Sequence, residues 1–347
     1  MVVLGVDAHK RSHTVVAVDE AGRKLGQRTA GTTSGDHLAL LAWAQELGGD
    51  RLWAVEDCRQ LSRRLERDLL GAGEQIVRVP PKMMAHARDA ARSYGKSDPI
   101  DALAVARAVL REPGLPSAQL DGPARQVRLL VDHRDDLVAE RTRAINRLRW
   151  HLHELDPAWD PPARSLWRPR HLTAILGRLD GDATLVARLA RSLALRCQVL
   201  TGEISQLDAE LGELTAALAP ELLKVCGCAT LTAAKIIGET AGIGRFRSRH
   251  AYARHNGTAP LPVWSGNRER HRLSRAGNRQ LNAALHRIAI TQAHYHPGAR
   301  AFLERRRAGG NTKPESLRAL KRRLSDVVYR ALLADAEPGP AGLTTAA

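Results

Sequence analysis

The chain has 347 residues, of which 44% are hydrophobic but 3% aromatic, and its formal net charge is +16. The hydrophobic share excludes a disordered chain, and the length allows two or three domains with mainly aliphatic cores. No apolar run reaches the roughly 18 residues of a membrane span, and the first residues lack the pattern of a secretory signal, so we expect a cytoplasmic protein.

The first 120 residues are typical of a mixed α/β domain. Short β-branched runs predict strands, and periodic apolar residues bounded by Gly or Pro predict helices. In chain order we predict strands at 2–8, 13–19 and about 23–31, a helix at 36–47, a strand at 51–56, a helix at 60–70, a strand at 75–79, and helices at 82–92 and 99–111. Three strands followed by alternating helices and strands match the order of a ribonuclease H-like mixed sheet, which we place at 1–120.

Two long helical patterns follow, at 124–155 and 183–219. Their apolar residues recur at alternating spacings of three and four, which is typical of heptad seams. The seams contain Ile145, Leu148, Leu152 and Leu155 in the first pattern, and Leu200, Ile204, Leu207, Leu211, Leu214 and Leu218 in the second. They favour an antiparallel or intermolecular coiled coil, although two helices packed within one bundle would give the same pattern. Prolines in 156–182 interrupt both helices, and we assign 121–220 to a coiled-coil or helical region.

The C-terminal part is predicted to be helical. Residues 221–246 contain two short helical patterns that meet at Gly227, which resembles a helix-hairpin-helix, although an ordinary helical hairpin would look the same. We expect a loop-rich stretch after residue 246, through Pro260 and Pro262, and a helix from about 277 to 294. We therefore place an all-α domain at 221–305 and a basic segment with a flexible tail at 306–347.

The positive charge is concentrated in two stretches. Residues 245–279 have a net charge of +8 and residues 300–323 a net charge of +7, which leaves +1 for the other 288 residues. Charge gathered in this way indicates a surface for a polyanion, and nucleic acid is the partner we expect. We assign nucleic-acid binding to the nine arginines of the first stretch, Arg245, Arg247, Arg249, Arg254, Arg268, Arg270, Arg272, Arg275 and Arg279.

Four carboxylates in the N-terminal domain form a candidate metal site. Asp7 lies in the first strand segment and Glu56 at the end of a later strand, and neighbouring strand ends bring such side chains together at the carboxyl edge of a sheet. Asp98 and Asp101 are three residues apart at a helix start and therefore share one face. Four converging acids would repel one another without a cation, and oxygen ligands suit Mg²⁺, as one ion or two.

Each acid taken singly also has a structural explanation. Asp98 immediately precedes a proline and could cap the helix, and Asp101 would then favour its first turn. Asp7 could be a surface acid, and Asp57 could take the place of Glu56. The order of the four together is harder to explain in this way.

That order resembles the DEDD transposases of the insertion-sequence one-ten family, whose N-terminal domain is similar to the Holliday-junction resolvase RuvC. The motifs NGTAP at 256–260, WSGN at 264–267 and LSRAGNRQLNAAL at 273–285 resemble the family's signature around its catalytic serine. The resemblance spans about residues 2–305. The sequence departs from it at His255 and Asn256, where the family more often has an aromatic and a small residue, and this departure concerns local packing.

The resemblance implies a mechanism and partners. Ser265, next to Gly266, would be the nucleophile and would form a transient phosphoserine link during Mg²⁺-dependent strand exchange on the element ends and target DNA. The family also implies a structured guide RNA, called a bridge RNA, action at the bacterial nucleoid, and, with the heptad seams, a dimer or tetramer. Considered without the family, Ser-Gly-Asn is an ordinary turn, and Ser274 is a rival serine that looks more like a local cap.

Three other functions fit parts of the sequence. A RuvC-like metal-dependent nuclease would use the same carboxylates with water as the nucleophile. A sugar-kinase-like or actin-like ATPase would use the N-terminal hairpin to contact phosphate, but it leaves both basic stretches unexplained. A non-catalytic nucleic-acid-binding protein would not need the five proposed catalytic residues. We therefore expect a transposase or recombinase.

Overall fold

The computed structural model describes residues 1–56, 61–80, 83, 97–112, 114–115, 117–118, 122–266, 268–272 and 277–336, with the backbone alone for 265 and 268–272. The chain forms two compact units. The first contains residues 1–122, 242–285 and 302–336, and the second contains 123–241 and 286–301. None of the described helices has both the length and the apolar character needed to cross a membrane.

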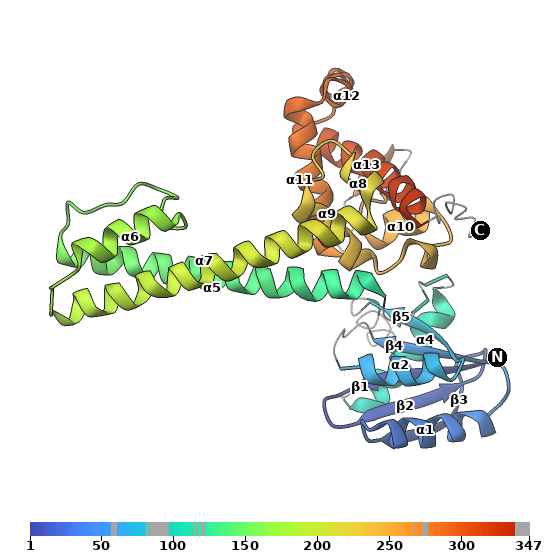
Figure 1. Cartoon of the computed structure of the whole chain (residues 1–347). Coiled ribbons are helices and arrows are strands. Elements are labelled where there is room, and N and C mark those ends of the chain that lie inside the picture. Colours follow the sequence, from blue (N-terminus) through green and yellow to red (C-terminus); the bar gives the residue numbers. More distant parts are fainter. Residues whose placement is uncertain are drawn as a thin grey trace, which may run out of the picture. The chain divides into compact units, whose positions relative to one another are not determined.

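The N-terminal part of the first unit is a five-stranded mixed sheet (Figure 1). Its strands are β1 (Val2–Ala8), β2 (His13–Val18), β3 (Lys24–Ala30), β4 (Arg51–Glu56) and β5 (Gln75–Val79), in the order β3-β2-β1-β4-β5. The first three strands are antiparallel, and β4 and β5 run parallel to β1. This confirms the predicted mixed α/β sheet. Asp57 and the helix predicted at 82–92, apart from Met83, lie outside the described residues.

Helices cover both faces of this sheet. Helix α4 (Asp98–Arg111) packs on one face, where its alanines meet side chains such as Val3 and Val16. Helices α1 (Ser34–Glu46) and α2 (Arg63–Gly71) pack on the other, against side chains such as Leu4 and Val6. Successive side chains of a strand point to opposite faces, so the odd-numbered residues of β1 face α4.

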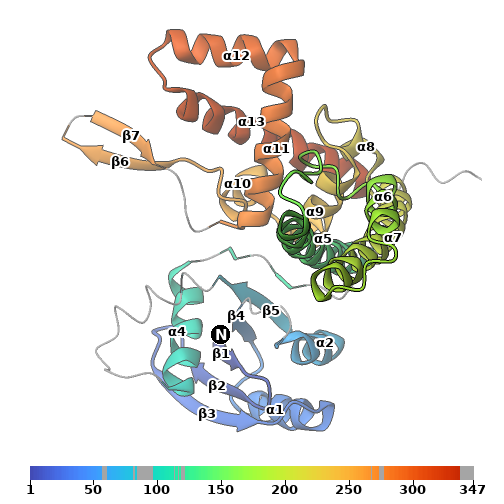
Figure 2. The ribbon, with the colours of Figure 1, turned by 90° about the vertical axis from the view of Figure 1, so that its left-hand side faces the viewer.

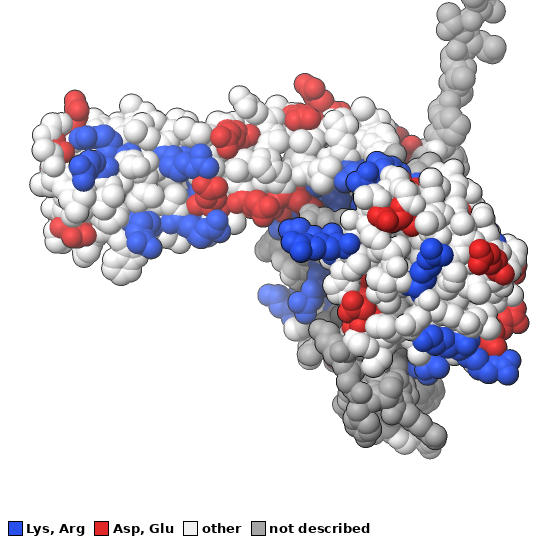
Figure 3. All heavy atoms as spheres, turned by 90° about the horizontal axis from the view of Figure 1, so that it is seen from below, with Lys and Arg blue, Asp and Glu red and all other residues white. Residues whose placement is uncertain are grey.

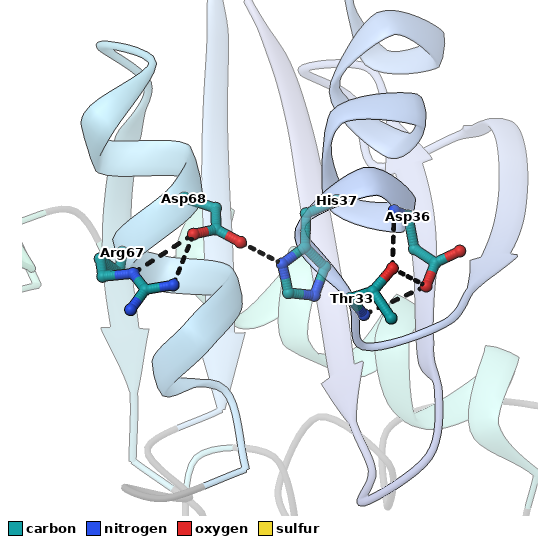
Figure 4. A network of polar contacts seen from close by, with 5 residues as sticks. All are labelled: Thr33, Asp36, His37, Arg67 and Asp68. Carbon is teal, nitrogen blue, oxygen red and sulfur yellow. Dashed lines mark hydrogen bonds and ion pairs between the residues drawn. The ribbon is translucent and has the colours of Figure 1, made fainter.

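A polar network holds α1 and α2 together (Figure 4). The side chain of Thr33 accepts a hydrogen bond from the backbone N–H of Asp36, whose carboxylate caps Thr33 in return, and this capping box begins α1. One turn along, His37 Nδ1 lies 2.7 Å from Asp68 Oδ2 on α2. The buried ring of His13 lies 5.3 Å from that of His37. Burial, followed by His37 and His9, lowers the pKa of His13 to about 4, so His13 is a neutral part of the core at physiological pH.

The second unit contains a long helical hairpin (Figure 1). Helix α5 (Pro123–Leu155) packs along α7 (Leu185–Leu218), and the short α6 (Pro169–Arg178) lies between them in sequence. Arg134 contacts Asp208 and Glu140 contacts Arg196, which makes the pair antiparallel. Seam residues of both helices, including Leu148 and Leu152 on α5 and Leu200, Ile204 and Leu211 on α7, are buried within the chain. Of the alternatives left by the sequence, the structure has two helices packed within one chain, and coiled-coil contact between chains stays a prediction.

Further helices and one β-hairpin follow the helical hairpin in the chain (Figure 2). They are α8 (Pro220–Leu223), α9 (Thr230–Thr240), the 3-10 helix η1 (Ile243–Arg245), α10 (Arg249–His255), β6 (Leu261–Ser265), β7 (Arg268–Arg272), α11 (Arg279–Tyr295), α12 (Pro297–Ala308) and α13 (Lys313–Ala336). The helix-hairpin-helix interpretation stays a prediction. At its proposed turn, Gly227 has a φ of 85° and packs against Thr291 and Ile288 of α11.

Two parts of this region are more regular than the sequence predicted. The stretch after 246, expected to be loop-rich, contains α10 and the β6–β7 hairpin. Proline is tolerated in edge strands, and Pro262 pairs with His271 in a sheet that has two strands among the described residues, so that both are edge strands there. Residues 306–336, which we expected to be a basic segment leading to a flexible tail, contain the end of α12, a short connection at 309–312 and all of α13. Helix α13 is anchored by buried Leu320, Leu324 and Val328.

Candidate active site and nucleic-acid interface

Strand pairing brings Asp7 and Glu56 to the same edge of the sheet. Strands β1 and β4 are parallel, and Val6 pairs with Val55, so the residues that follow each of them lie side by side. Both side chains belong to the set that faces α4, because Val3 on β1 and Ala54 on β4 pack there. The expectation that parallel strand ends would bring these two acids together is met.

Helix α4 brings Asp98 and Asp101 to this edge, and Gly5 allows it to lie close. A Cβ atom on Gly5 would lie 2.1 Å from the backbone oxygen of Ala102 and 2.5 Å from the backbone nitrogen of Ala106. Any side chain on Gly5 would therefore push α4 away from β1. The N-cap position of α4 belongs to Ser97, and Asp98 is the first helical residue, so the cap explanation for Asp98 does not hold.

The surroundings of Asp7 oppose its ionisation. Its side chain is 7% exposed, and burial raises the pKa of Asp7 to about 6 from its usual 3.8. His9 works against this rise, whereas Asp101, Asp98 and Glu56 add to it. All three predicted partners thus lie within electrostatic reach of Asp7. Among the described residues, the buried Oδ2 atom of Asp7 has no hydrogen-bond partner.

These features fit a divalent metal ion. A buried carboxylate oxygen without a donor, surrounded by further carboxylates, is an unfavourable arrangement unless a cation neutralises it. Asp101 is buried and Asp98 is about half exposed, so the group extends from the interior to the surface. Asp7 and Asp98 lie close enough to contact a common ion. Metal binding by all four carboxylates, with Glu56 and Asp101 included, stays a prediction.

His9 also belongs to this group, although we did not predict it from the sequence. Its Nδ1 atom lies 3.6 Å from Asp7 Oδ2 and 4.0 Å from Asp98 Oδ2. The signal was present, because His9 follows Asp7 by two residues at the end of β1, but we interpreted it as part of a polar connection between strands.

Ser265 lies at the end of the β6–β7 hairpin (Figure 2). It is the last residue of β6 and pairs with Arg268 of β7, and Gly266 follows it with a φ of 57°. Gly266 therefore has the turn role that the Ser-Gly-Asn motif also predicts. The structure describes Ser265 by its backbone, and Ser274 lies outside the described residues.

A buried polar cluster lies at the base of this hairpin. Asn256 is fully buried; its Nδ2 donates to Ser325 Oγ on α13 at 2.8 Å, and its Oδ1 accepts from the backbone and hydroxyl of Thr258 at 3.1 and 2.7 Å. Asn282 Nδ2 donates to the backbone oxygen of Asn256 at 2.9 Å, and Lys321 Nζ donates to Asn282 Oδ1 at 2.6 Å. The departure from the family pattern at Asn256 is thus a well-packed residue that satisfies its hydrogen bonds.

The two ends of the hairpin segment also touch through glycines. A Cβ atom on Gly277 would lie 2.2 Å from the backbone nitrogen of Gly257, and the backbone N–H of Asn278 donates to the carbonyl of His255 at 2.6 Å. The hairpin segment therefore begins and ends at the same place, where Gly257 of the NGTAP motif meets Gly277 of the AGN motif. Part of the sequence signature around Ser265 is a structural clamp at the base of the hairpin.

The nine arginines assigned to nucleic acid fall into different settings. Arg247, Arg249, Arg254 and Arg279 are exposed, and Arg254 forms an ion pair with Glu112 at 2.7 Å. Arg245 is half-buried, with its guanidinium over the ring of Phe246 at 4.7 Å, so it has a packing role. Arg268, Arg270 and Arg272 are alternate residues of β7, and Arg275 lies outside the described residues.

The helical hairpin carries charges of both signs. On the face drawn in Figure 3, blue and red side chains both occur along α5 and α7. Several of these charges pair across the two helices, as Arg134 does with Asp208 at 2.6 Å. On the described part of its surface, the helical hairpin therefore does not have the strong excess of positive charge that the two arginine-rich stretches have.

Known proteins resemble this chain along most of its length. A family model described as "Transposase" matches residues 4–157, and a second, described as "Transposase IS116/IS110/IS902 family", matches residues 219–304. The chain is 29% identical to the IS900 uncharacterized 42 kDa protein of Mycobacterium paratuberculosis, over 99% of this chain and 98% of that one. It is also 29% identical to the IS116 uncharacterized 44.8 kDa protein of Streptomyces clavuligerus, over 95% and 94%. The chain belongs to the IS110 family of transposases.

This result confirms the predicted family. A transposase acts on DNA, which is therefore the substrate of this protein. The first matched region contains all four carboxylates and the second contains Ser265. Among solved structures, the chain is similar to T. thermophilus RuvC in complex with a Holliday junction substrate, with 18% identity and a TM-score of 0.26 over 31% of this chain and 91% of that one. A score this low decides nothing about the transposase.

Proposed function

We propose that this transposase cuts and rejoins DNA strands through a phosphoserine intermediate at Ser265, with a divalent metal site at Asp7, Glu56, Asp98 and Asp101. The observation that carries the proposal is the buried Oδ2 atom of Asp7, which has no hydrogen-bond partner in the described part of the chain and lies within electrostatic reach of the three other carboxylates. Such a cluster of carboxylates destabilises the protein when no ion is bound. A functional role for the ion would explain why the chain contains the cluster.

The carboxylates would bind the ion and orient the DNA phosphate beside it. When bound, Mg²⁺ would supply positive charge that stabilises the oxygens of a phosphodiester under attack. The first turn of α4 suits this task, because the N-terminal end of a helix also favours negative charge.

Ser265 would carry out the covalent step. Its Oγ forms a bond to phosphorus, the bond from phosphorus to one deoxyribose oxygen breaks, and the proton lost by the serine ends on the leaving oxygen. Strand exchange is the reverse reaction with the oxygen of another strand. Gly266 beside the nucleophile offers room for a phosphate to approach closely.

The arginines would hold the nucleic acid. Exposed Arg247, Arg249 and Arg279 and the alternate arginines of β7 supply positive charge in the segment that contains Ser265. The family resemblance adds a bridge RNA as a second polyanion, and the separate basic stretch at 300–323 gives it a further surface. We also propose a homodimer or tetramer, in which the serine of one subunit acts beside the carboxylates of another.

The decisive experiment traps the covalent intermediate. Labelled DNA that contains the element ends is incubated with the full-length protein, its guide RNA and Mg²⁺, and the products are denatured. We expect a protein–DNA adduct that is absent for Ser265→Ala and present for the matched control Ser274→Ala. Cleaved DNA without any adduct, or an active Ser265→Ala protein, would establish the nuclease that uses water and refute the serine mechanism.

Mixed subunits test assembly in trans. Ser265→Ala and Asp7→Ala proteins are each expected to be inactive alone, and a mixture should regain strand exchange because one subunit supplies the serine and the other the carboxylates. If the mixture remains inactive while both variants still oligomerise, each active site is built within one subunit. Co-purification of RNA transcribed from the flanking DNA tests the guide.

A further inference from the structure

His9 lies where a fifth metal-binding side chain would lie. It follows β1 directly, and its backbone N–H donates to the carbonyl of Ser12 at 2.9 Å, which closes the connection between β1 and β2. This backbone bond fixes the position of His9 without using its ring. The side chain is 51% exposed, so an ion could reach it from solvent.

The ring faces the carboxylates rather than the core. Nδ1 of His9, one carboxylate oxygen of Asp7 and one of Asp98 all lie within 4.8 Å of one another. Three donors this close can contact a common ion. The Asp7 oxygen nearest to His9 is the buried Oδ2 atom that has no hydrogen-bond partner among the described residues. This second observation separates the group from an ordinary cluster of surface acids.

The mixed set of donors has consequences for which ion binds. Carboxylate oxygens suit Mg²⁺ and Mn²⁺ alike, whereas an imidazole nitrogen suits first-row transition ions and adds little for Mg²⁺. Between these two ions, a site with several carboxylates and one imidazole therefore favours Mn²⁺.

We propose that His9 binds the divalent ion together with Asp7 and Asp98, and that its imidazole makes the site prefer Mn²⁺ to Mg²⁺. This inference rests on the proposed function in one respect, namely that a divalent ion binds at Asp7. The alternative role for His9 is that of a polar partner that contacts the acids when no ion is bound.

Metal binding to the DNA-free, full-length protein tests the inference without any measurement of activity. Binding of Mn²⁺ is followed by the loss of the free-ion signal in electron paramagnetic resonance, and Mg²⁺ is measured by competition. The variants are His9→Ala, Asp7→Asn and the matched control His133→Ala, which removes an exposed imidazole from α5. We expect His9→Ala to lose about 10-fold or more in Mn²⁺ affinity while Mg²⁺ affinity changes by less than about threefold.

A spectroscopic signature completes the test. Electron spin echo modulation should detect a ligating nitrogen next to bound Mn²⁺ in the parent protein and in His133→Ala, and should not detect it in His9→Ala. Equal losses of Mn²⁺ and Mg²⁺ affinity in His9→Ala, an unchanged nitrogen signal, or a similar loss in His133→Ala would each overturn the role of His9. If Asp7→Asn leaves binding of both ions intact, the metal site itself fails, which is a separate outcome.

Discussion

Replacing Asp7 by Asn should stabilise the N-terminal sheet when metal is absent. The buried carboxylate of Asp7 has a pKa of about 6 in the folded protein against a usual value of 3.8. Each unit of difference corresponds to about 1.4 kcal/mol, so ionised Asp7 lowers the free energy of unfolding by about 3 kcal/mol. Asparagine has nearly the same shape and no charge, and removes this penalty.

The sign of the effect depends on pH in a defined way. A carboxyl group whose pKa is raised by folding costs nothing below its unfolded pKa, and its full cost is present above the folded pKa. The advantage of Asp7→Asn should therefore be largest above pH 7 and fall below about 1 kcal/mol at pH 4. Groups such as His13 titrate equally in both proteins and cancel in the difference.

Hydrogen exchange provides the measurement. In EDTA at pH 7.5, the slowest amides of β1 and β4 should exchange about 100-fold more slowly in Asp7→Asn than in the parent protein. The control Glu46→Gln, which neutralises an exposed acid at the end of α1, should change stability by less than about 0.5 kcal/mol. Adding Mn²⁺ should slow exchange in the parent protein and have little effect on Asp7→Asn. An Asp7→Asn protein that is no more stable than its parent at pH 7.5 would refute the reasoning.

Further predictions follow from the packing and the charges. Gly5→Ala should lower the free energy of unfolding, measured by thermal unfolding, by about 1–3 kcal/mol, because α4 moves away from β1. It should also weaken Mn²⁺ binding although no ligand is altered, and unchanged binding would contradict the placement of α4. Asn256→Ala should cost about 2–3 kcal/mol in urea unfolding, since it leaves buried partners unsatisfied, and a loss below about 0.5 kcal/mol would show that the cluster is not tightly packed. Arg247→Gln combined with Arg249→Gln should make the slope of log binding constant against log salt concentration less steep by about 0.9 per arginine. Arg23→Gln, in the N-terminal sheet domain, should leave this slope unchanged.

Much of the N-terminal domain could be predicted because its signals are local. The runs at β1, β2 and β4 are apolar and β-branched, and the capped, periodic pattern of α1 indicates a helix without reference to the rest of the chain. The meeting of Asp7 and Glu56 followed from a general property of parallel strands.

The features that were missed depend on contacts between distant residues. Nothing around Gly5 shows that a helix a hundred residues later will lie against it, and the proximity of His9 to Asp98 has the same origin. The two prolines near β6 suggested a loop, because local preference does not reveal that this hairpin has only two strands. The role of Asn256 required α11 and α13 to be in place around it.

The glycine contact at the base of the β6–β7 hairpin separates the hairpin segment from the helices on either side of it. Because Gly257 and Gly277 meet in space, everything between them begins and ends at the same location. A change in the length or sequence of such a segment should not move the helices on either side, because the distance between its two ends stays the same. Exchanging residues 258–276 for the matching segment of a relative should therefore leave the packing of the helices on either side intact.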